Sequence, residues 1–453
     1  MFAAINAFLT RAVSAGYFLN KSLRFRSSAS AYLNRTFGTP TNNKKWTWSG
    51  WVKRGALSGN YYLISASDSP TNSVLAELQF NANDTLGFNV NQGGSYTFVP
   101  TTTAVFRDPA AWYHIVFVFD SAQATLALGC QLYVNGVAQT LSGTYTQNGA
   151  TILNSSGAVT NIGRRAYSST YYFDGEMAEV NFVDGQALAP TSFGAFSTYN
   201  QWLPIRYAGT YGTNGFYLPF TNTTSTSTLV ADSSGNANNW TPNNISLTAG
   251  STYDSLTDVP TLTSTTVANY PVLSPLSTYN GGGTLSNGNL TVSLPTSTNN
   301  KPTLTANTGK WYAEFTCISA GGYSGTGLAI VTSSGTSLGG PTTLLRAEYA
   351  NNGQTYSYSA VGYVAYGSTW TDNDVIGVAW DCAAGQVTYY KNNVSQGTLS
   401  SPTISVTSGG DSFSFVPSNY STGATASFSV NYGQQPWKYS LPSGFLALNT
   451  YNI

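Results

Sequence analysis

Short apolar runs closed by turn residues recur from about residue 20 to the end of this 453-residue chain. The runs Trp112–Phe119 and Asp374–Trp380 are typical of buried strands, and Asn135-Gly136 is typical of a hairpin turn. Only 8% of the residues are charged, against a usual ~25%, and helix surfaces would need more Glu and Lys. The pattern therefore predicts an all-β chain rather than a helical bundle.

Two segments of the chain carry most of the strand pattern, and their hairpins resemble each other. Tyr133–Gln139 reads Tyr-x-Asn-Gly-Val-x-Gln, and Tyr390–Gln396 reads Tyr-x-Asn-Asn-Val-x-Gln. This echo indicates a shared architecture, and the strand density fits two antiparallel β-sandwich (jelly-roll) domains. The expected divisions are an N-terminal helix at 1–19, a sandwich at 20–222, an irregular connector at 223–280 rich in Thr, Ser, Asn and Pro, and a second sandwich at 281–453.

The first segment is the one part of the sequence with a clear helical periodicity. Its apolar residues recur at spacings of three and four, which places them on one face, and Gly16 is a stop signal. A short isolated helix is marginal in water, so this face must be buried somewhere. We expect it to dock into a partner as an anchor or oligomerisation segment; the alternative is packing on its own domain. The face consists of Phe2, Ile5, Phe8, Leu9, Ala12 and Val13.

Charge is divided unevenly along a chain whose net charge is zero. Residues 1–67 hold nine basic residues and no acidic residue, so the remainder carries a net charge of −9. This asymmetry predicts either that the N-terminal part meets an acidic partner or that its charges lie on solvated strand edges. The sparse basic residues argue against a nucleic-acid partner.

The cysteines and the apolar segments indicate the cellular compartment in which the chain folds. Cys130, Cys317 and Cys382 lack metal-site spacing, and buried free thiols are expected, although Cys317 and Cys382 could also pair. Free thiols fit folding in a reducing cytoplasm. Met1–Gly16 lacks the basic start of a secretory signal, and no stretch of ~18 apolar residues would span a membrane.

The strand motifs resemble two known families. The first region is similar to a laminin G-like, concanavalin A-like jelly roll, and the second to a SPRY domain; both families are sandwiches of two antiparallel sheets. The first resemblance rests on Trp51–Lys53, Trp112–Ile115, Leu132–Gly136, Asn161–Gly163 and Phe173–Val180. The second rests on Gly309–Glu314, Asp374–Asp381 and Val387–Asn392.

The order of further motifs resembles tail-fibre and other structural proteins of bacteriophages, especially marine ones. These motifs include Trp48–Gly55, Gly215–Phe220, Asp232–Asn236, Asn239–Asn244 and Asn431–Gln434. The resemblance implies a virion protein on the particle exterior, made in the host cytoplasm and attached through its N-terminal segment. Its expected partners are other virion proteins, copies of itself with a trimer favoured, and a host surface glycan or protein. The alternative is a capsid decoration (cement) protein or a tail adaptor that binds no host ligand.

Enzyme activity is not expected, although concanavalin A-like folds also include glucanases. Hydrolysis of a glycoside needs two carboxylates facing one sugar. Glu176 and Glu179 stand three apart on a strand, so they should point to opposite faces, and Ala178 replaces the Asp of the glucanase pattern. His114 is the sole histidine and lies within a strand, where a hydrogen-bonded structural role is expected.

Binding residues are the remaining candidates. Tyr61, Tyr62, Tyr171 and Tyr172 lie near turn-rich segments and could present aromatic rings with polar tips to a sugar; the alternative is a role in the core or in a subunit interface. Tyr356, Tyr358, Tyr363 and Tyr366 could do the same in the second region. No cofactor is expected apart from a candidate calcium ion at Asp84 and Asp174, which resemble the loop aspartates of laminin G-like domains; the alternative is that both make Asx-turns.

Overall fold

The computed structural model describes residues 16–68, 73–321, 326–332, 345–357, 363–400, 412–419 and 423–453. The predicted anchor face, with Phe2, Ile5, Phe8, Leu9, Ala12 and Val13, lies outside these residues. Strands dominate the described part, and nearly all strand pairs are antiparallel, which confirms the all-β prediction. No helix in this part is long and apolar enough to cross a membrane.

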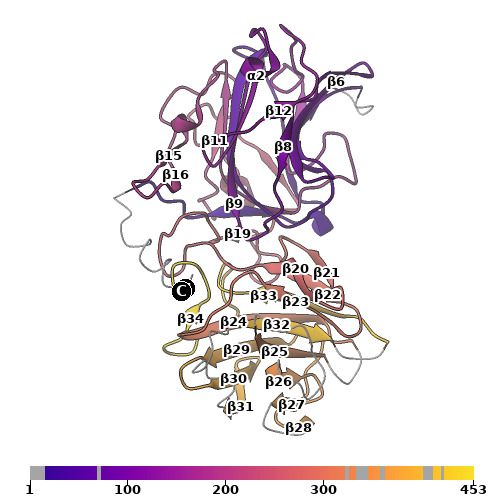
Figure 1. Cartoon of the computed structure of the whole chain (residues 1–453), viewed down its shortest axis with the longest axis vertical. Coiled ribbons are helices and arrows are strands. Elements are labelled where there is room, and N and C mark those ends of the chain that lie inside the picture. The colour runs from indigo at the N-terminus through magenta and orange to yellow at the C-terminus, as the bar shows by residue number, and fades with distance from the viewer. Residues whose placement is uncertain are drawn as a thin grey trace. The chain divides into compact units, whose positions relative to one another are not determined.

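The chain divides into two compact units, each described here by itself (Figure 1). The N-terminal unit runs to Leu247 and also includes Asp254–Thr261, whereas the C-terminal unit comprises Thr248–Tyr253 and Leu262–Ile453. Residues 223–280, which we expected to be a connector, thus contribute to both units. They include helix α3 (Thr226–Leu229), β18 (Thr241–Asn243), β19 (Ser255–Leu256) and β20 (Leu273–Tyr279).

Two antiparallel sheets form the N-terminal unit, with eight and nine strands among the described residues. The first has the order β11 (Val137–Ala138), β10 (Cys130–Val134), β9 (Trp112–Asp120), β3 (Lys45–Arg54), β14 (Gly175–Asp184), β1 (Ser22–Phe25) and β19, with β17 (Phe216–Leu218) also on β14. The second has the order β12 (Leu141–Ser142), β8 (Thr101–Val105), β6 (Thr85–Gln92), β5 (Val74–Phe80), β4 (Tyr61–Ser67), β13 (Val159–Ile162), β2 (Tyr32–Thr36) and β18, with β7 (Ser95–Phe98) also on β6. Smaller elements are η1 (Ser27–Ala29), α2 (Leu126–Gly129), η2 (Pro190–Ser192) and the ribbon β15 (Gly194–Phe196)–β16 (Trp202–Pro204).

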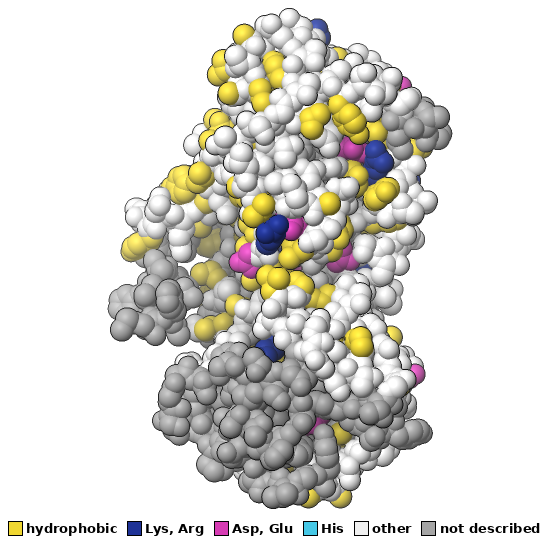
Figure 2. All heavy atoms as spheres, turned by 45° about the vertical axis from the view of Figure 1, so that its right-hand side comes forward, with side chains coloured by type: hydrophobic (Ala, Val, Ile, Leu, Met, Phe, Trp, Pro, Cys, Tyr) yellow, Lys and Arg dark blue, Asp and Glu magenta, His cyan; other side chains and the backbone are white. Residues whose placement is uncertain are grey.

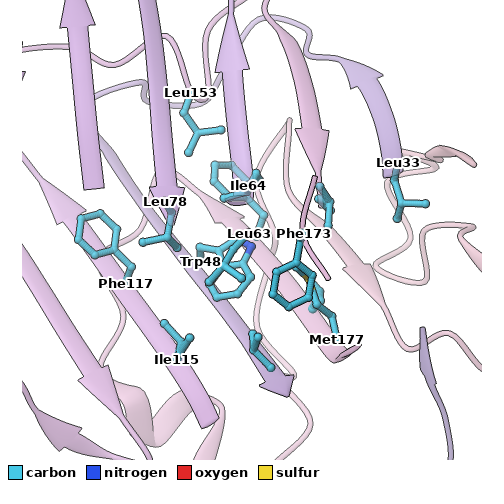
Figure 3. Close-up of a cluster of buried hydrophobic side chains, with 14 of the residues drawn as sticks. Leu33, Trp48, Leu63, Ile64, Leu78, Ile115, Phe117, Leu153, Phe173 and Met177 are labelled. Carbon is cyan, nitrogen blue, oxygen red and sulfur yellow. The ribbon is translucent and has the colours of Figure 1, made fainter. Parts of the chain in front are cut away.

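Alternating side chains of the two sheets meet in a continuous apolar core. Trp48 of β3 and Phe117 of β9 come from one sheet, and Ile64 and Leu78 come from the other (Figure 3). Trp46 and Trp48 are fully buried in this core. The pairing of β3 with β9 continues without a bulge through Gly50, so Trp51 falls on the opposite face of its sheet.

The outer face of the eight-stranded sheet is also covered by apolar side chains. The segment after β14 packs Phe193, Tyr207 and Tyr211 onto Val116 and Val118 of β9. Both faces of β9 are therefore buried, which explains why its sequence does not alternate between polar and apolar residues.

Buried ion pairs lie within the N-terminal unit, and they involve some of the basic residues that are in excess in residues 1–67. Asp254 pairs with Arg24 at 3.2 Å and with Arg26 at 2.8 Å, and Asp258 pairs with Lys53 at 2.6 Å. For these basic residues both of our readings were wrong, because they are buried and their acidic partners belong to the same chain. Elsewhere, charged side chains are few on the face that Figure 2 shows, and several lie beside one of opposite sign.

The C-terminal unit repeats the architecture of two antiparallel sheets, with seven and eight strands among the described residues. One sheet has the order β20, β23 (Thr298–Pro302), β32 (Phe413–Asn419), β25 (Thr326–Thr332), β26 (Leu345–Ala350), β27 (Gln354–Ser357) and β28 (Tyr363–Ala365). The other has the order β21 (Thr284–Ser286), β22 (Thr291–Leu294), β33 (Ala426–Asn431), β24 (Lys310–Ser319), β29 (Val375–Asp381), β30 (Gln386–Lys391) and β31 (Val394–Ser400), and β34 (Leu446–Ala447) pairs with β24 in parallel.

Both predicted hairpins form, and they use the same hydrogen bonds. Asn135 receives a bond on its side chain from the His114 amide and donates its own amide to the His114 carbonyl. Asn392 exchanges the same two bonds with Val375. Both Asn residues have positive φ, as the tight turn requires. The sequence echo therefore reflects a common local structure.

Candidate functional site

Tyrosine and arginine side chains gather on the outer face of the nine-stranded sheet. Tyr62 of β4 lies against Tyr171 with ring centroids 6.1 Å apart, and the Arg165 guanidinium lies 5.9 Å from the first ring and 5.8 Å from the second. Tyr62 is buried, whereas Tyr171 is 45% exposed. An accessible ring and a guanidinium thus form one end of the cluster.

A second group repeats the arrangement beside the first. The Arg164 guanidinium lies 4.3 Å from the Tyr32 ring and 5.7 Å from the Tyr172 ring, and the two rings are 6.2 Å apart. A β-bridge between Arg164 and Tyr172 closes the loop that carries both groups. We call Tyr32, Tyr62, Arg164, Arg165, Tyr171 and Tyr172 the tyrosine–arginine surface.

The surface is fixed from below by a buried carboxylate. Glu77 of β5 accepts a hydrogen bond from the Arg165 Nε. Burial raises the pKa of Glu77, although the pairing with Arg165 works in the opposite direction. Because Arg165 is held by this bond, its guanidinium plane stays near both tyrosine rings without further ordering.

Tyr61 does not belong to this surface. Its hydroxyl donates to the Leu57 carbonyl at 3.4 Å, and its ring packs against the core. Sequence reasoning therefore named three of the four tyrosines and missed Tyr32, Arg164 and Arg165. The consecutive arginines beside Tyr171 and Tyr172 were a usable signal, since guanidinium groups stack on aromatic faces.

The two calcium candidates are engaged by protein donors. Asp84 accepts from Arg54 at 2.9 Å and from Arg107 at 2.8 Å, one on each carboxylate oxygen. Asp174 accepts from the Ser27 hydroxyl. No group of three or more His, Cys, Asp or Glu suited to a metal occurs in the described ranges. Calcium at Asp84 would have to displace two guanidinium groups, so this donor set does not fit the ion there.

His114 is a structural residue. Trp202 Nε1 donates to its Nδ1 at 2.8 Å, so its Nε2 carries the proton and bonds to the Ser49 hydroxyl at 2.9 Å. Its ring stacks on Trp51 with centroids 4.8 Å apart. Burial lowers its pKa to about 3, which keeps the ring neutral. The three cysteines are likewise free and buried.

A β-bulge overturns the expectation that Glu176 and Glu179 face opposite ways. The pairing of β14 shifts register between Ala178 and Asn181, and the extra residue brings both carboxylates to the outer side of the sheet. Glu176 is buried beside Ser22, whereas Glu179 bonds to Tyr217. Glu179 lines a pocket on this side of the sheet, whereas Glu176 does not line it.

The tyrosines proposed for the second region do not form a described surface. Tyr358 and the side chains of Tyr356 and Tyr363 lie outside the described residues. Tyr366 donates to the Gly397 carbonyl and packs edge-on against Tyr349, so it supports the core.

Comparisons with known proteins agree with the fold of the N-terminal unit. Residues 27–192 match the family model described as the concanavalin A-like lectin/glucanases superfamily, which confirms the predicted laminin G-like jelly roll. No curated protein sequence matches the chain.

Similar solved structures include a pentraxin, a SPRY domain and a pair of laminin domains. A native heptameric SAP-like pentraxin from Limulus polyphemus is 15% identical with a TM-score of 0.30, covering 37% of this chain and 77% of its own. The SPRY domain of human HERC1 is 14% identical with a TM-score of 0.29, covering 35% and 96%. Domains LG4-5 of mouse laminin α1 are 11% identical with a TM-score of 0.32, covering 93% and 90%. At these values the likenesses carry no argument about ligands.

Proposed function

We propose that this chain is a non-enzymatic binding protein of a bacteriophage particle, a tail fibre or similar appendage, and that its tyrosine–arginine surface binds host glycan. The observation that carries the binding part is the paired stacking of Arg165 on Tyr62 and Tyr171 and of Arg164 on Tyr32 and Tyr172. The order of the sequence motifs that resemble those of bacteriophage structural proteins supports the proposal that the chain belongs to a virion.

The chemistry of this surface suits a saccharide. An aromatic ring packs on the C–H face of a sugar, while phenol and guanidinium groups hydrogen-bond its hydroxyls. Binding at one such site is weak, and several copies on one particle would multiply it. Glu176 is buried, and it does not line the pocket that Glu179 lines, so we propose no hydrolysis.

The binding part is tested by applying the full chain to a glycan array, with Tyr171→Ala and Tyr172→Ala combined in one variant. We expect that variant to lose binding by about tenfold or more, as for truncated aromatic hot spots. Tyr199→Ala is the matched control, because Tyr199 is 51% exposed on the same unit but outside the surface. Undiminished binding by the double variant would reject this surface as the site.

The virion part is tested by reconstruction of the purified particle. Chains that project with the tyrosine–arginine surface free would support an appendage that attaches to the host. Chains that lie on the shell with this surface buried against neighbours would instead establish the capsid decoration or adaptor alternative.

A further inference from the structure

A second polar site lies on the other sheet of the N-terminal unit. A pocket of about 420 Å³ opens between the segment before β1 and the strands β14 and β17. Its lining includes Tyr17, Lys21, Glu179, Arg206, Tyr217 and Thr221. This volume is in the range of small-molecule sites. None of these residues belongs to the tyrosine–arginine surface.

Backbone strain presents Glu179 to this pocket. Glu179 has a φ of 52° at the bulge of β14, a conformation that residues other than glycine rarely adopt. The Asn181 side chain donates to the Glu179 carbonyl at 3.0 Å and holds the bulge in place. Strain of this kind costs free energy and concentrates at functional sites, so the position calls for an explanation.

The hydrogen bonds around Glu179 lack one proton when its carboxylate is ionised. The Tyr217 hydroxyl lies 2.8 Å from one carboxylate oxygen, and the Tyr17 hydroxyl lies 3.0 Å from each. The two hydroxyls are also 2.7 Å apart. Two hydroxyl protons cannot satisfy the three pairwise contacts of this triangle, whereas protonation of Glu179 supplies a third.

Burial also favours the protonated form of Glu179. It raises the pKa of Glu179 to about 7, against the lowering effects of Tyr217, Tyr17 and Arg206. Tyr211 also faces this carboxylate, and burial raises the pKa of Tyr17, Tyr211 and Tyr217, so all three phenols stay neutral between pH 6 and 8. Burial also lowers the pKa of Lys21, which lines the same pocket. Glu179 is the lining carboxyl whose pKa lies near neutral pH.

The pocket also holds two cations. Lys21 and Arg206 form no ion pair with any residue in the described part of the chain. The Arg206 guanidinium lies 5.0 Å from the Tyr217 ring. Among the described residues that line the pocket, Glu179 is the one acidic residue, so its protonation leaves excess positive charge there, which favours an anionic ligand.

We infer that this pocket binds a sugar acid, a polyhydroxylated monocarboxylate. Arg206 and Lys21 bind the carboxylate, and the Thr221 hydroxyl bonds to hydroxyl groups of the ligand. The ionised form of Glu179 repels the ligand, so binding requires its protonated form.

The test titrates the full chain with D-galacturonate and follows the amide NMR shifts of residues 17–21. The apparent Kd should weaken by about tenfold from pH 6 to pH 8, because the fraction of protonated Glu179 falls by that factor around a pKa of about 7. D-Glucose and acetate should bind far more weakly than galacturonate. Equal binding of either compound, or no galacturonate binding at pH 6, would overturn the inference.

Variants separate the roles of the charged groups. Glu179→Gln should bind galacturonate with the same Kd at both pH values, while Arg206→Gln should lose about tenfold or more at each. Lys44→Gln is the matched control, since it removes a charge from a partly exposed lysine outside the pocket. A wild-type Kd that does not change with pH would contradict the role of Glu179 even without a variant.

Discussion

Each unit buries a glutamate on the outer face of a sheet, but the two are held differently. Glu314 of β24 accepts from the backbone amides of Lys438 at 2.8 Å and Tyr439 at 2.9 Å. The Tyr312 hydroxyl also donates to Glu314, at 3.3 Å. Glu179 of β14 accepts from the Tyr17 and Tyr217 hydroxyls beside a pocket, and no backbone amide among the described residues donates to its carboxylate. Burial raises the pKa of Glu314, and its two backbone amides offset part of that effect because they are fixed donors. Hydroxyls, in contrast, can rotate and can accept as well as donate. The contrast separates a structural glutamate from a candidate functional one.

The two units otherwise use corresponding strands. The order β10–β9–β3–β14–β1 of the N-terminal unit has the counterpart β30–β29–β24–β33–β22. Both hairpins exchange the same bonds through Asn135 and Asn392. A shared scaffold thus carries different chemistry, which is the general relation between fold and function.

The largest effect that we expect is the loss of stability in Glu314→Ala. The substitution leaves two backbone amides and the Tyr312 hydroxyl without their partner, so it should cost about 3–4 kcal/mol. At pH 8, where the contribution of protonated Glu179 is lost, Glu179→Ala should cost only about 1 kcal/mol, because its hydroxyl partners can turn toward the pocket. Urea unfolding of the full chain, with hydrogen exchange to identify the unit that unfolds, measures both variants. Equal losses would remove the distinction between the two residues.

The next effect is a pH dependence of stability that Glu179 introduces. Its pKa is higher in the folded chain, about 7, than its ordinary 4.5. The stabilising contribution is therefore complete below about pH 4.5 and is lost as the pH rises to about 7. It amounts to about 3 kcal/mol.

Glu179→Gln isolates this contribution from that of Glu176, whose pKa burial also raises. The difference in unfolding free energy between wild type and variant should change from pH 4.5 to pH 7 and stay constant above pH 8. A difference that is constant across the whole range would show that Glu179 does not titrate near neutrality.

The smallest effect concerns the shared hairpins. Asn135→Ala and Asn392→Ala each remove a side-chain hydrogen bond and place alanine at positive φ, so each should cost about 1–2 kcal/mol. Thermal unfolding followed by hydrogen exchange would locate each loss in its own unit. A loss at one hairpin only would break the correspondence between the units.

The sequence predicted what depends on local pattern. Alternation, apolar runs and the Asn-Gly turn gave the sheets and the paired hairpins, because neighbours along the chain determine these features. Contacts between distant residues were missed: Asp254 and Asp258 bind Arg24, Arg26 and Lys53 across more than 200 residues. The bulge at Glu179 was missed for another reason, since one extra residue reverses the face of every side chain that follows it.

The most direct test of the contrast is a pH titration of the glutamate carboxyl ¹³C signals by NMR. The chain has five glutamates, so each signal can be followed, and Glu179→Gln assigns the relevant one. We predict that the Glu179 signal titrates with a midpoint near pH 7. A midpoint below about pH 5 would mean that Glu179 is ionised at neutral pH, and its proposed role as the group that titrates near neutral pH would be contradicted.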